Sequence, residues 1–219
     1  MFLGTAELMN IEIRLEQESD YRVVEELTKE AFWNLYQPGG DEHYLLHQLR
    51  KSPDFIPELD CVALVDNVIV GHITYSRSYV LNENNNQYEM CTFGPISVLP
   101  QWQNQGIGSA LIEHTKNIAC EKGDRAIIIF GYPDYYKRFG FKTAKEYGIS
   151  DPDGRFPVAH LVLELYEGAL KEISGKFFAS EVFNIDPNAA EVFDQSFPQN
   201  EKLVLPSQEL FIKTSTSFL

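Results

Sequence analysis

The stretch from Gln103 to Gly108, Gln-Asn-Gln-Gly-Ile-Gly, has the residue types and spacing best suited to binding a ligand. It lies between an apolar, strand-like run at 91–99 and a helical pattern that ends near Gly123. Backbone N–H groups at a helix start have no intrahelical partner and carry about half a positive charge. Gly106 and Gly108 have no side chain, so a ligand can approach these groups closely. The stretch predicts a phosphate or pyrophosphate site, the alternative being a tight turn that leads into a surface helix.

The spacing of the glycines excludes two common phosphate loops. A Walker loop ends in Gly-Lys-Ser or Gly-Lys-Thr, which is missing here, and a dinucleotide fingerprint needs a small residue where Leu111 stands. The remaining pattern, Gln-x-x-Gly-x-Gly, resembles the pyrophosphate-binding motif of the GNAT superfamily, the acyl-CoA-dependent N-acyltransferases. Tyr-x-x-x-Gly-Phe, from Tyr136 to Phe141, resembles the second signature of that superfamily. The two motifs are separated by one helical pattern and one buried apolar run at 126–130.

The order of the expected elements agrees with this resemblance. Periodicity alone predicts a mixed α/β domain. The resemblance implies an α/β (α+β) fold with a GNAT-like mixed central sheet, a splayed parallel strand pair, flanking helices and a C-terminal extension. We expect a flexible N-terminus at 1–8, an acetyltransferase domain at 9–166 and an extension packed on the core at 167–219, with fraying from Lys213 onward. Within this extension, Gly168 to Phe183 resembles a bacterial N-acetyltransferase subgroup whose substrates are poorly defined.

Pro95 lies in a strand-like run, although proline cannot donate a hydrogen bond to a sheet and is avoided in central strands. A β-bulge is the expected solution. In the resembled family this strand is bulged and parts from its parallel neighbour, which leaves backbone groups facing the pantetheine arm and the acetyl carbonyl. The resemblance therefore implies acetyl-CoA as cosubstrate and assigns its binding to Ile96, Ser97, Val98, Gln103, Asn104, Gln105, Gly106, Ile107 and Gly108.

The implied reaction is transfer of an acetyl group from acetyl-CoA to a primary amine by direct attack in a ternary complex. Tyr136 occupies the general-acid position of the family, where a phenol gives a proton to the leaving thiolate. The alternatives are that Tyr136 only packs against Phe139 and Phe141, or that Tyr135 takes the role. Glu83, Glu89 and Asp134 are near the right segments, but the sequence singles out none of them as the general base.

Other observations limit the activity. Many family members have an asparagine where this chain has Ile129, so one contact common in the family is absent. The alternative function is a non-catalytic acyl-CoA-binding or sensor protein with the same fold, which keeps the loop but has lost the acceptor chemistry. His43 and His47 have the spacing of two metal ligands on one helix face, but no third ligand is evident and we expect no metal. On the resembled fold His43 would border the acceptor pocket.

Composition bears on partners and compartment. The chain has 18 Lys and Arg against 32 Asp and Glu, a net charge of −14, which argues against nucleic acid as a partner. Three scattered cysteines do not form a disulfide framework, and no apolar run is long enough to span a membrane. We expect a cytoplasmic enzyme that acts on a small-molecule amine or a protein amine, with a homodimer as one option for its assembly.

Overall fold

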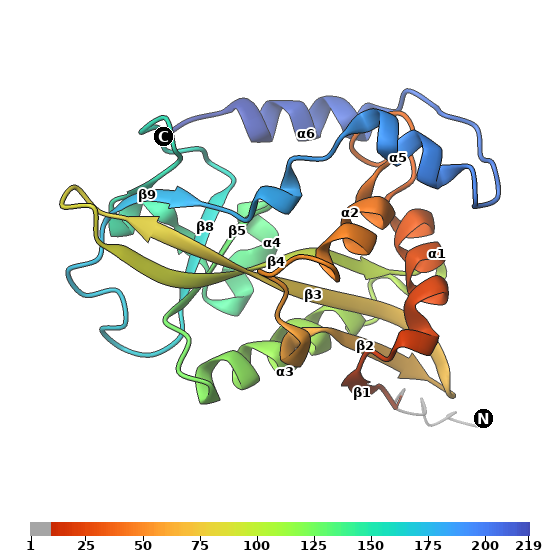
Figure 1. The fold of residues 1–219 in the computed structure, drawn as a ribbon, viewed down its shortest axis with the longest axis horizontal. Coiled ribbons are helices and arrows are strands. Elements are labelled where there is room, and N and C mark those ends of the chain that lie inside the picture. Colours follow the sequence, from red (N-terminus) through yellow and green to blue (C-terminus); the bar gives the residue numbers. More distant parts are fainter. Residues whose placement is uncertain (1–9) are drawn as a thin grey trace, which may run out of the picture.

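The computed structural model describes residues 10–219, and the predicted flexible segment 1–8 lies outside the described residues (Figure 1). The strands are β1 (Glu12–Leu15), β2 (Cys61–Val65), β3 (Val68–Leu81), β4 (Gln87–Val98), β5 (Ala126–Phe130), β6 (Lys142–Thr143), β7 (Ile149–Ser150), β8 (His160–Glu164) and β9 (Gly175–Phe178). The helices are α1 (Tyr21–Phe32), α2 (Glu42–Leu49), α3 (Ile107–Glu121), α4 (Pro133–Tyr136), α5 (Pro187–Asp194) and α6 (Pro206–Thr216).

All these strands belong to one mixed sheet. Its main order is β1-β2-β3-β4-β5-β8-β6, and within this order only the β4–β5 pair is parallel. The long strand β3 pairs with β2 along its first half and with β9 near its end, so a strand from the C-terminal segment joins the same sheet. Strand β9 also pairs in parallel with β7. The predicted fold class, a mixed α/β sheet with helices on both faces, is confirmed.

The helices cover the two faces of the sheet because buried strands alternate their side chains between those faces. Val62 and Leu64 of β2 pack with Val24 of α1 and Leu46 of α2. The other residues of β2 belong to the main core cluster, which includes Ile107 at the start of α3. Helices α1 and α2 therefore lie on one face and α3 on the other. This arrangement holds the start of α3 beside the end of β4.

Strands β4 and β5 separate soon after they meet. Their one register pair is Cys91 with Ile127, after which β4 runs on to Val98. The register between β3 and β4 shifts where Tyr75 faces Phe93 and Ile73 faces Ile96, so β4 has one extra residue at Gly94–Pro95. The bulge predicted at Pro95 is confirmed. The bulge redirects the last residues of β4, whose outer edge is left without a neighbouring strand.

The C-terminal segment packs over the end of the domain that contains α1 and α2. Figure 1 shows α5 beside these helices and α6 crossing the top of the view. Lys29 Nζ of α1 lies 2.5 Å from Asp194 Oδ1 of α5, and both side chains are buried. In α6, Phe211 stacks on Tyr36 with ring centroids 4.3 Å apart. Helix α6 continues past Lys213 to Thr216, and the fraying expected from Lys213 onward stays a prediction.

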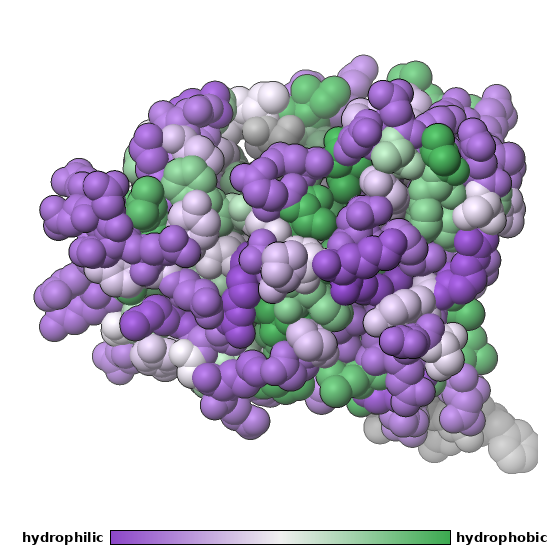
Figure 2. Space-filling model, in the orientation of Figure 1, coloured by the Kyte–Doolittle hydropathy of each residue, from purple (hydrophilic) through white to green (hydrophobic). Residues whose placement is uncertain are grey.

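The surface is largely polar on the face shown in Figure 2, where hydrophobic areas are small and separate. Among the described residues, no helix combines the length and the apolar character that a membrane crossing requires.

Candidate functional site

A cavity of about 870 Å³ lies where α1, β4, β5, α3, α4 and α6 converge. This volume is in the range of small-molecule and cofactor sites. We divide its walls by the elements that supply them. The loop half comes from β4, the glycine loop, α3 and α4: Ile96, Val98, Trp102, Gln103, Asn104, Gly106, Ile107, Gly108, Ser109, Tyr135, Tyr136 and Arg138. The aromatic half comes from α1, the segments next to β5 and β8, and α6: Ala31, Phe32, Leu35, Tyr36, Phe130, Gly131, Tyr132, Ala159, Phe211 and Thr214.

The outer edge of β4 supplies hydrogen-bond donors to the loop half. The Leu99 N–H donates to Val70 of β3, and the N–H groups of successive strand residues point to opposite edges. The N–H groups of Val98 and Ile96 therefore point away from β3, toward the gap that opens between β4 and β5. On that same edge, the side-chain amide of Gln103 donates to the Val98 carbonyl at 3.1 Å. Gln103 thus closes the loop onto the strand and leaves the N–H groups available.

The glycine loop supplies a second set of donors. Gly106 is the N-cap of α3 and has a left-handed backbone, φ +88°, which glycine adopts without strain. The first backbone bond of the helix runs from Ala110 N–H to Gly106 O. Within residues 10–219, the N–H groups of Gly106, Ile107, Gly108 and Ser109 have no acceptor. A Cβ at Gly106 would meet no atom within 4 Å, and all four residues line the cavity.

Tyr136 lies between the loop half and the core. Its ring packs against Phe93 and Phe141, with centroid distances of 5.9 and 5.5 Å. A Cβ at Gly131 would lie 2.3 Å from the Tyr136 ring, so only glycine leaves room for the ring there. Burial raises the pKa of Tyr136 well above its usual value, with a smaller contribution from Tyr36, whose own pKa burial raises to about 12. The phenol is therefore protonated at neutral pH.

The neighbours of Tyr136 on α4 also face the loop half. A Cβ at Gly108 would lie 3.3 Å from the Tyr135 hydroxyl, which places this hydroxyl over the start of α3. The Arg138 guanidinium lies over the Tyr135 ring, 4.1 Å from its centroid. Among the described residues that line the cavity, Arg138 alone carries a charge. Sequence reasoning did not single out Arg138, although its place two residues after Tyr136 was a usable signal.

Some residues expected at the site lie apart from the cavity. The Ser97 hydroxyl is buried against Thr28, at 3.1 Å from its hydroxyl oxygen, and the Gln105 side chain donates to the Gln101 carbonyl. For Ser97 and Gln105, contact through the backbone stays a prediction. Glu83, Glu89 and Asp134, the candidates for the general base, are not among the lining residues. His43, expected to border the acceptor pocket, is not a lining residue either; its Nε2 lies 3.0 Å from Asp194 Oδ1.

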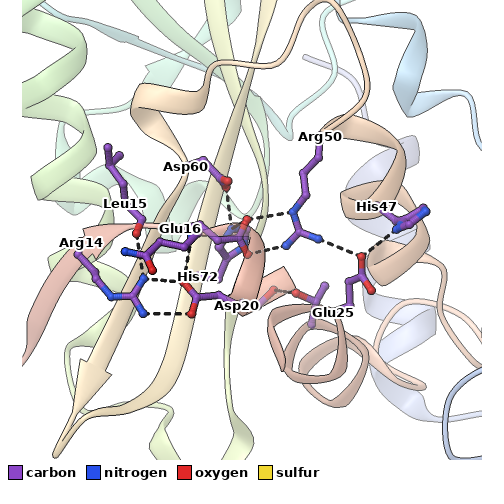
Figure 3. A network of polar contacts seen from close by, with 12 residues as sticks. Arg14, Leu15, Glu16, Asp20, Glu25, His47, Arg50, Asp60 and His72 are labelled. Atoms are coloured by element: carbon purple, nitrogen blue, oxygen red, sulfur yellow. Dashed lines mark hydrogen bonds and ion pairs between the residues drawn. The ribbon is translucent and has the colours of Figure 1, made fainter. Parts of the chain in front are cut away.

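A separate buried cluster lies outside the cavity and consists of Glu16, Asp60 and His72 (Figure 3). Among the described residues, these three have ligand atoms close enough together to hold a metal ion. The atoms lie within 4.8 Å of one another. Arg50 donates to both carboxylate oxygens of Glu16, at 2.5 and 2.9 Å, and also to Glu25. His72 Nε2 lies 2.8 Å from Asp60 Oδ1. The guanidinium of Arg50 already balances charge in this cluster, and its contacts tie the end of α2 to the segment after β1.

Burial displaces the pKa values of several groups outside the cavity. Among them, the buried histidines are His43, His72 and His160, whose pKa values fall to about 4. The buried glutamates are Glu16 and Glu42, whose pKa values rise to about 8 and about 7. In each case the largest cause is loss of hydration, which disfavours the charged form. For Glu16 this effect outweighs the opposing charges of His72 and Arg50.

Comparison with known proteins identifies relatives of this chain. A family model described as "Acetyltransferase (GNAT) domain" matches residues 58–143. The uncharacterized N-acetyltransferase YjhQ of Escherichia coli K12 is 28% identical over 102 residues, which are 45% of this chain and 54% of YjhQ. The chain thus spans about half the length of that relative. The uncharacterized N-acetyltransferase YhbS of the same organism is 27% identical over 173 residues, 78% of this chain and 98% of YhbS.

Two solved structures share the fold. The GNAT family N-acetyltransferase YhbS from Escherichia coli, solved in complex with CoA, has a TM-score of 0.70 and 24% identity, and the match covers 83% of this chain and 96% of that one. A GNAT family acetyltransferase from Brucella melitensis, solved in complex with acetyl-CoA, has a TM-score of 0.65 and 24% identity, with 80% and 99% covered.

Proposed function

Because the chain belongs to the GNAT family of acetyl-CoA-dependent N-acetyltransferases, we propose that it moves the acetyl group of acetyl-CoA to a primary amine by direct attack, with both substrates bound together. One observation carries the proposal. The unpaired N–H groups at the open edge of β4 and those at the start of α3 border a single cavity, which Tyr136 also lines.

Acetyl-CoA supplies an acetyl group activated as a thioester, and the loop half has the donors to hold it. The N–H groups from Gly106 to Ser109 suit the pyrophosphate, since they combine free donors with the positive end of a helix. The N–H groups of Ile96 and Val98 suit the pantetheine arm and the thioester oxygen. A backbone donor aimed at a developing oxyanion contributes about 3 kcal/mol to transition-state stabilisation. Arg138 adds a positive charge to the same half.

Tyr136 serves as the proton carrier in this proposal. The amine nitrogen forms a bond to the acetyl carbon, the carbon–sulfur bond breaks, and the thiolate takes the proton of the Tyr136 hydroxyl. The phenolate left on Tyr136 then takes the proton that the new amide nitrogen must lose, directly or through water. The step balances without a separate base, in keeping with a cavity whose described lining residues include no carboxylate. It requires the amine to arrive as its free base.

The compartment, the acceptor class and the assembly state of the enzyme are also proposals. We place it in the cytoplasm, since Cys61, Cys91 and Cys120 are all free thiols, as a reducing compartment favours. The acceptor is a small-molecule or protein amine, nucleic acid is not a partner, and self-association into a homodimer stays open to measurement. No metal takes part in the proposed step.

The test combines binding with turnover. Acetyl-CoA at a hundred times its Kd should stabilise the protein by about 2.7 kcal/mol, which raises the melting temperature by roughly 5–10 °C. Thiol release with a panel of amines should then detect turnover, and Tyr136→Phe should lower kcat with acetyl-CoA affinity unchanged. Binding without turnover of any amine would instead favour the non-catalytic acyl-CoA sensor. The absence of any thermal shift would reject the proposed site altogether.

A further inference from the structure

We propose that the acceptor is a small arylalkylamine, a primary amine on a short alkyl chain that ends in an aromatic ring (below, an aromatic amine), and not a polyamine, an amino sugar or a lysine side chain. This inference rests on the proposed function and names the substrate class of the same site. It follows from the aromatic rings that line the aromatic half of the cavity and from the lack of Asp and Glu among the described lining residues.

The aromatic half is built from rings that converge from separate parts of the fold. Phe32 and Tyr36 come from the end of α1 and the residues after it, Phe130 from the end of β5, and Phe211 from α6. Tyr36 and Phe211 stack at 4.3 Å, so α6 meets the segment that follows α1. Phe130 is 55% exposed, although its ring stacks on His160 from below at 4.7 Å. An exposed ring face inside a cavity favours a planar apolar ligand, since ring-on-ring contact adds to the burial of apolar surface.

The charges of the wall exclude the polycationic acceptors. Although acids outnumber bases by 14 in the whole chain, the described residues that line this cavity include no Asp or Glu. The charged side chain among the described lining residues is the positive guanidinium of Arg138. A polyamine would bring additional ammonium groups, and an amino sugar or a lysine-bearing peptide additional polar groups, into a wall that offers no carboxylate and, beside the hydroxyls of Tyr36, Tyr132 and Thr214, mostly apolar surface. Burying an ammonium group without a charge partner is unfavourable. An aromatic amine taken as its free base has no such groups beyond the nitrogen that reacts.

The experiment compares amines at saturating acetyl-CoA, using 2-phenylethylamine and tryptamine against n-butylamine, spermidine and a lysine-bearing peptide. We expect kcat/KM for the aromatic amines to exceed that of each other amine at least tenfold. Phe211→Ala should reduce this preference over n-butylamine several-fold and leave the KM for acetyl-CoA unchanged. Leu35→Glu, which places a carboxylate on the same wall, should increase kcat/KM for spermidine relative to 2-phenylethylamine.

Each outcome bears on the inference separately from the proposed function. If spermidine or the peptide is the better acceptor, or if n-butylamine equals 2-phenylethylamine, the aromatic-amine assignment is wrong and the acetyltransferase stands. If acetyl-CoA binds but no amine in the panel is acetylated, the assignment is also wrong. If acetyl-CoA produces no thermal shift, the function itself fails, and the substrate class fails with it. The comparison among amines uses the unaltered protein, so it decides the matter even if Phe211→Ala or Leu35→Glu does not fold.

Discussion

Gly131 tests the role of Tyr136 without altering Tyr136 itself. In Gly131→Ala the added Cβ would lie 2.3 Å from one ring carbon of Tyr136 and 2.7 Å from a second. Non-bonded carbons settle at about 3.5 Å or more, so the ring must move by about 1.2 Å, the difference between 3.5 and 2.3. Gly131 does not have a positive φ, so the backbone accepts alanine and the clash is the main effect.

A displacement of this size should act on catalysis far more than on cofactor binding. Misplacing a catalytic group by about 1 Å can lower a rate by about a hundredfold. We therefore expect kcat of Gly131→Ala to fall by about two orders of magnitude, while the KM for acetyl-CoA changes less than about threefold because the donors at Ile96, Val98 and 106–109 are untouched. The ring packs tightly on Phe93 and Phe141, so overpacking should also cost about 1–3 kcal/mol of stability. Thiol-release kinetics and a melting curve on the same sample measure both.

Two further variants separate this explanation from general damage. Gly154→Ala strains the left-handed backbone (φ +84°) of a turn that does not line the cavity, so it should lower stability and leave kcat unchanged, which controls for general damage. Tyr136→Phe removes the hydroxyl and keeps the ring, for an expected loss of about 10²- to 10⁴-fold. If Gly131→Ala acts through the hydroxyl, adding it to Tyr136→Phe should lower kcat little further. A kcat of Gly131→Ala near that of the unaltered protein, or fully additive losses in the double variant, would refute the reasoning.

Three other predictions follow from the same structure. Gly108→Val directs a branched side chain toward the Tyr135 hydroxyl and the amide donors, and calorimetric titration should show acetyl-CoA affinity reduced at least about tenfold; unchanged affinity would contradict a pyrophosphate site here. Asp194→Asn leaves Lys29 buried without its charge partner and should cost about 3–5 kcal/mol in urea unfolding, whereas a loss below about 1 kcal/mol would show that α5 does not depend on this pair. Stability should be greatest near pH 6.5. Between about pH 4.5 and 6.5, the three buried histidines are protonated only in the unfolded chain and the two buried glutamates only in the folded chain. The unfolded chain thus binds one more proton, so the free energy of unfolding rises with pH. Above about pH 6.5 the histidines are neutral in both states, and the free energy of unfolding falls up to about pH 8 because only the folded chain still holds the glutamate protons. Melting temperatures that stay flat from pH 5 to 8 would contradict this.

The local features of the fold were readable from the sequence because short-range chemistry determines them. Aspartate and asparagine tolerate left-handed backbone in turns, and Asp66 and Asn67, between β2 and β3, both have positive φ. Aspartate is a favoured N-cap residue, and the carboxylate of Asp186, just before α5, accepts a hydrogen bond from the N–H of Asn188. The run at 126–130 is the buried strand that its apolar composition predicted. In each case the residues that determine the conformation lie within a few positions of one another.

The aromatic half of the cavity could not be read from the sequence in this way. Phe32, Phe130 and Phe211 are separated by about eighty to one hundred residues, and each alone is typical of a core position. Helix α6 has no clear apolar stripe, and β9 has only four residues, so neither produced a periodic signal. Only the folded chain shows that these rings face one space and that the acidic residues lie elsewhere.

The position of the charges bears on how a strongly acidic chain would hold acetyl-CoA, a polyanion, in the proposed site. At physiological ionic strength, charges farther away than about 8 Å are largely screened, and no Asp or Glu of the described residues lines the cavity, although Glu42 acts on the lining residue Tyr36. Local groups decide the potential there: the N–H donors of the loop, the start of α3, and Arg138 held over Tyr135. The lack of carboxylates among the described lining residues also favours a neutral aromatic acceptor, because no carboxylate then stabilises the amine in its protonated, unreactive form. In the proposed function, phosphate capture and the choice of acceptor thus depend on one arrangement, in which no Asp or Glu of the described residues lines the cavity.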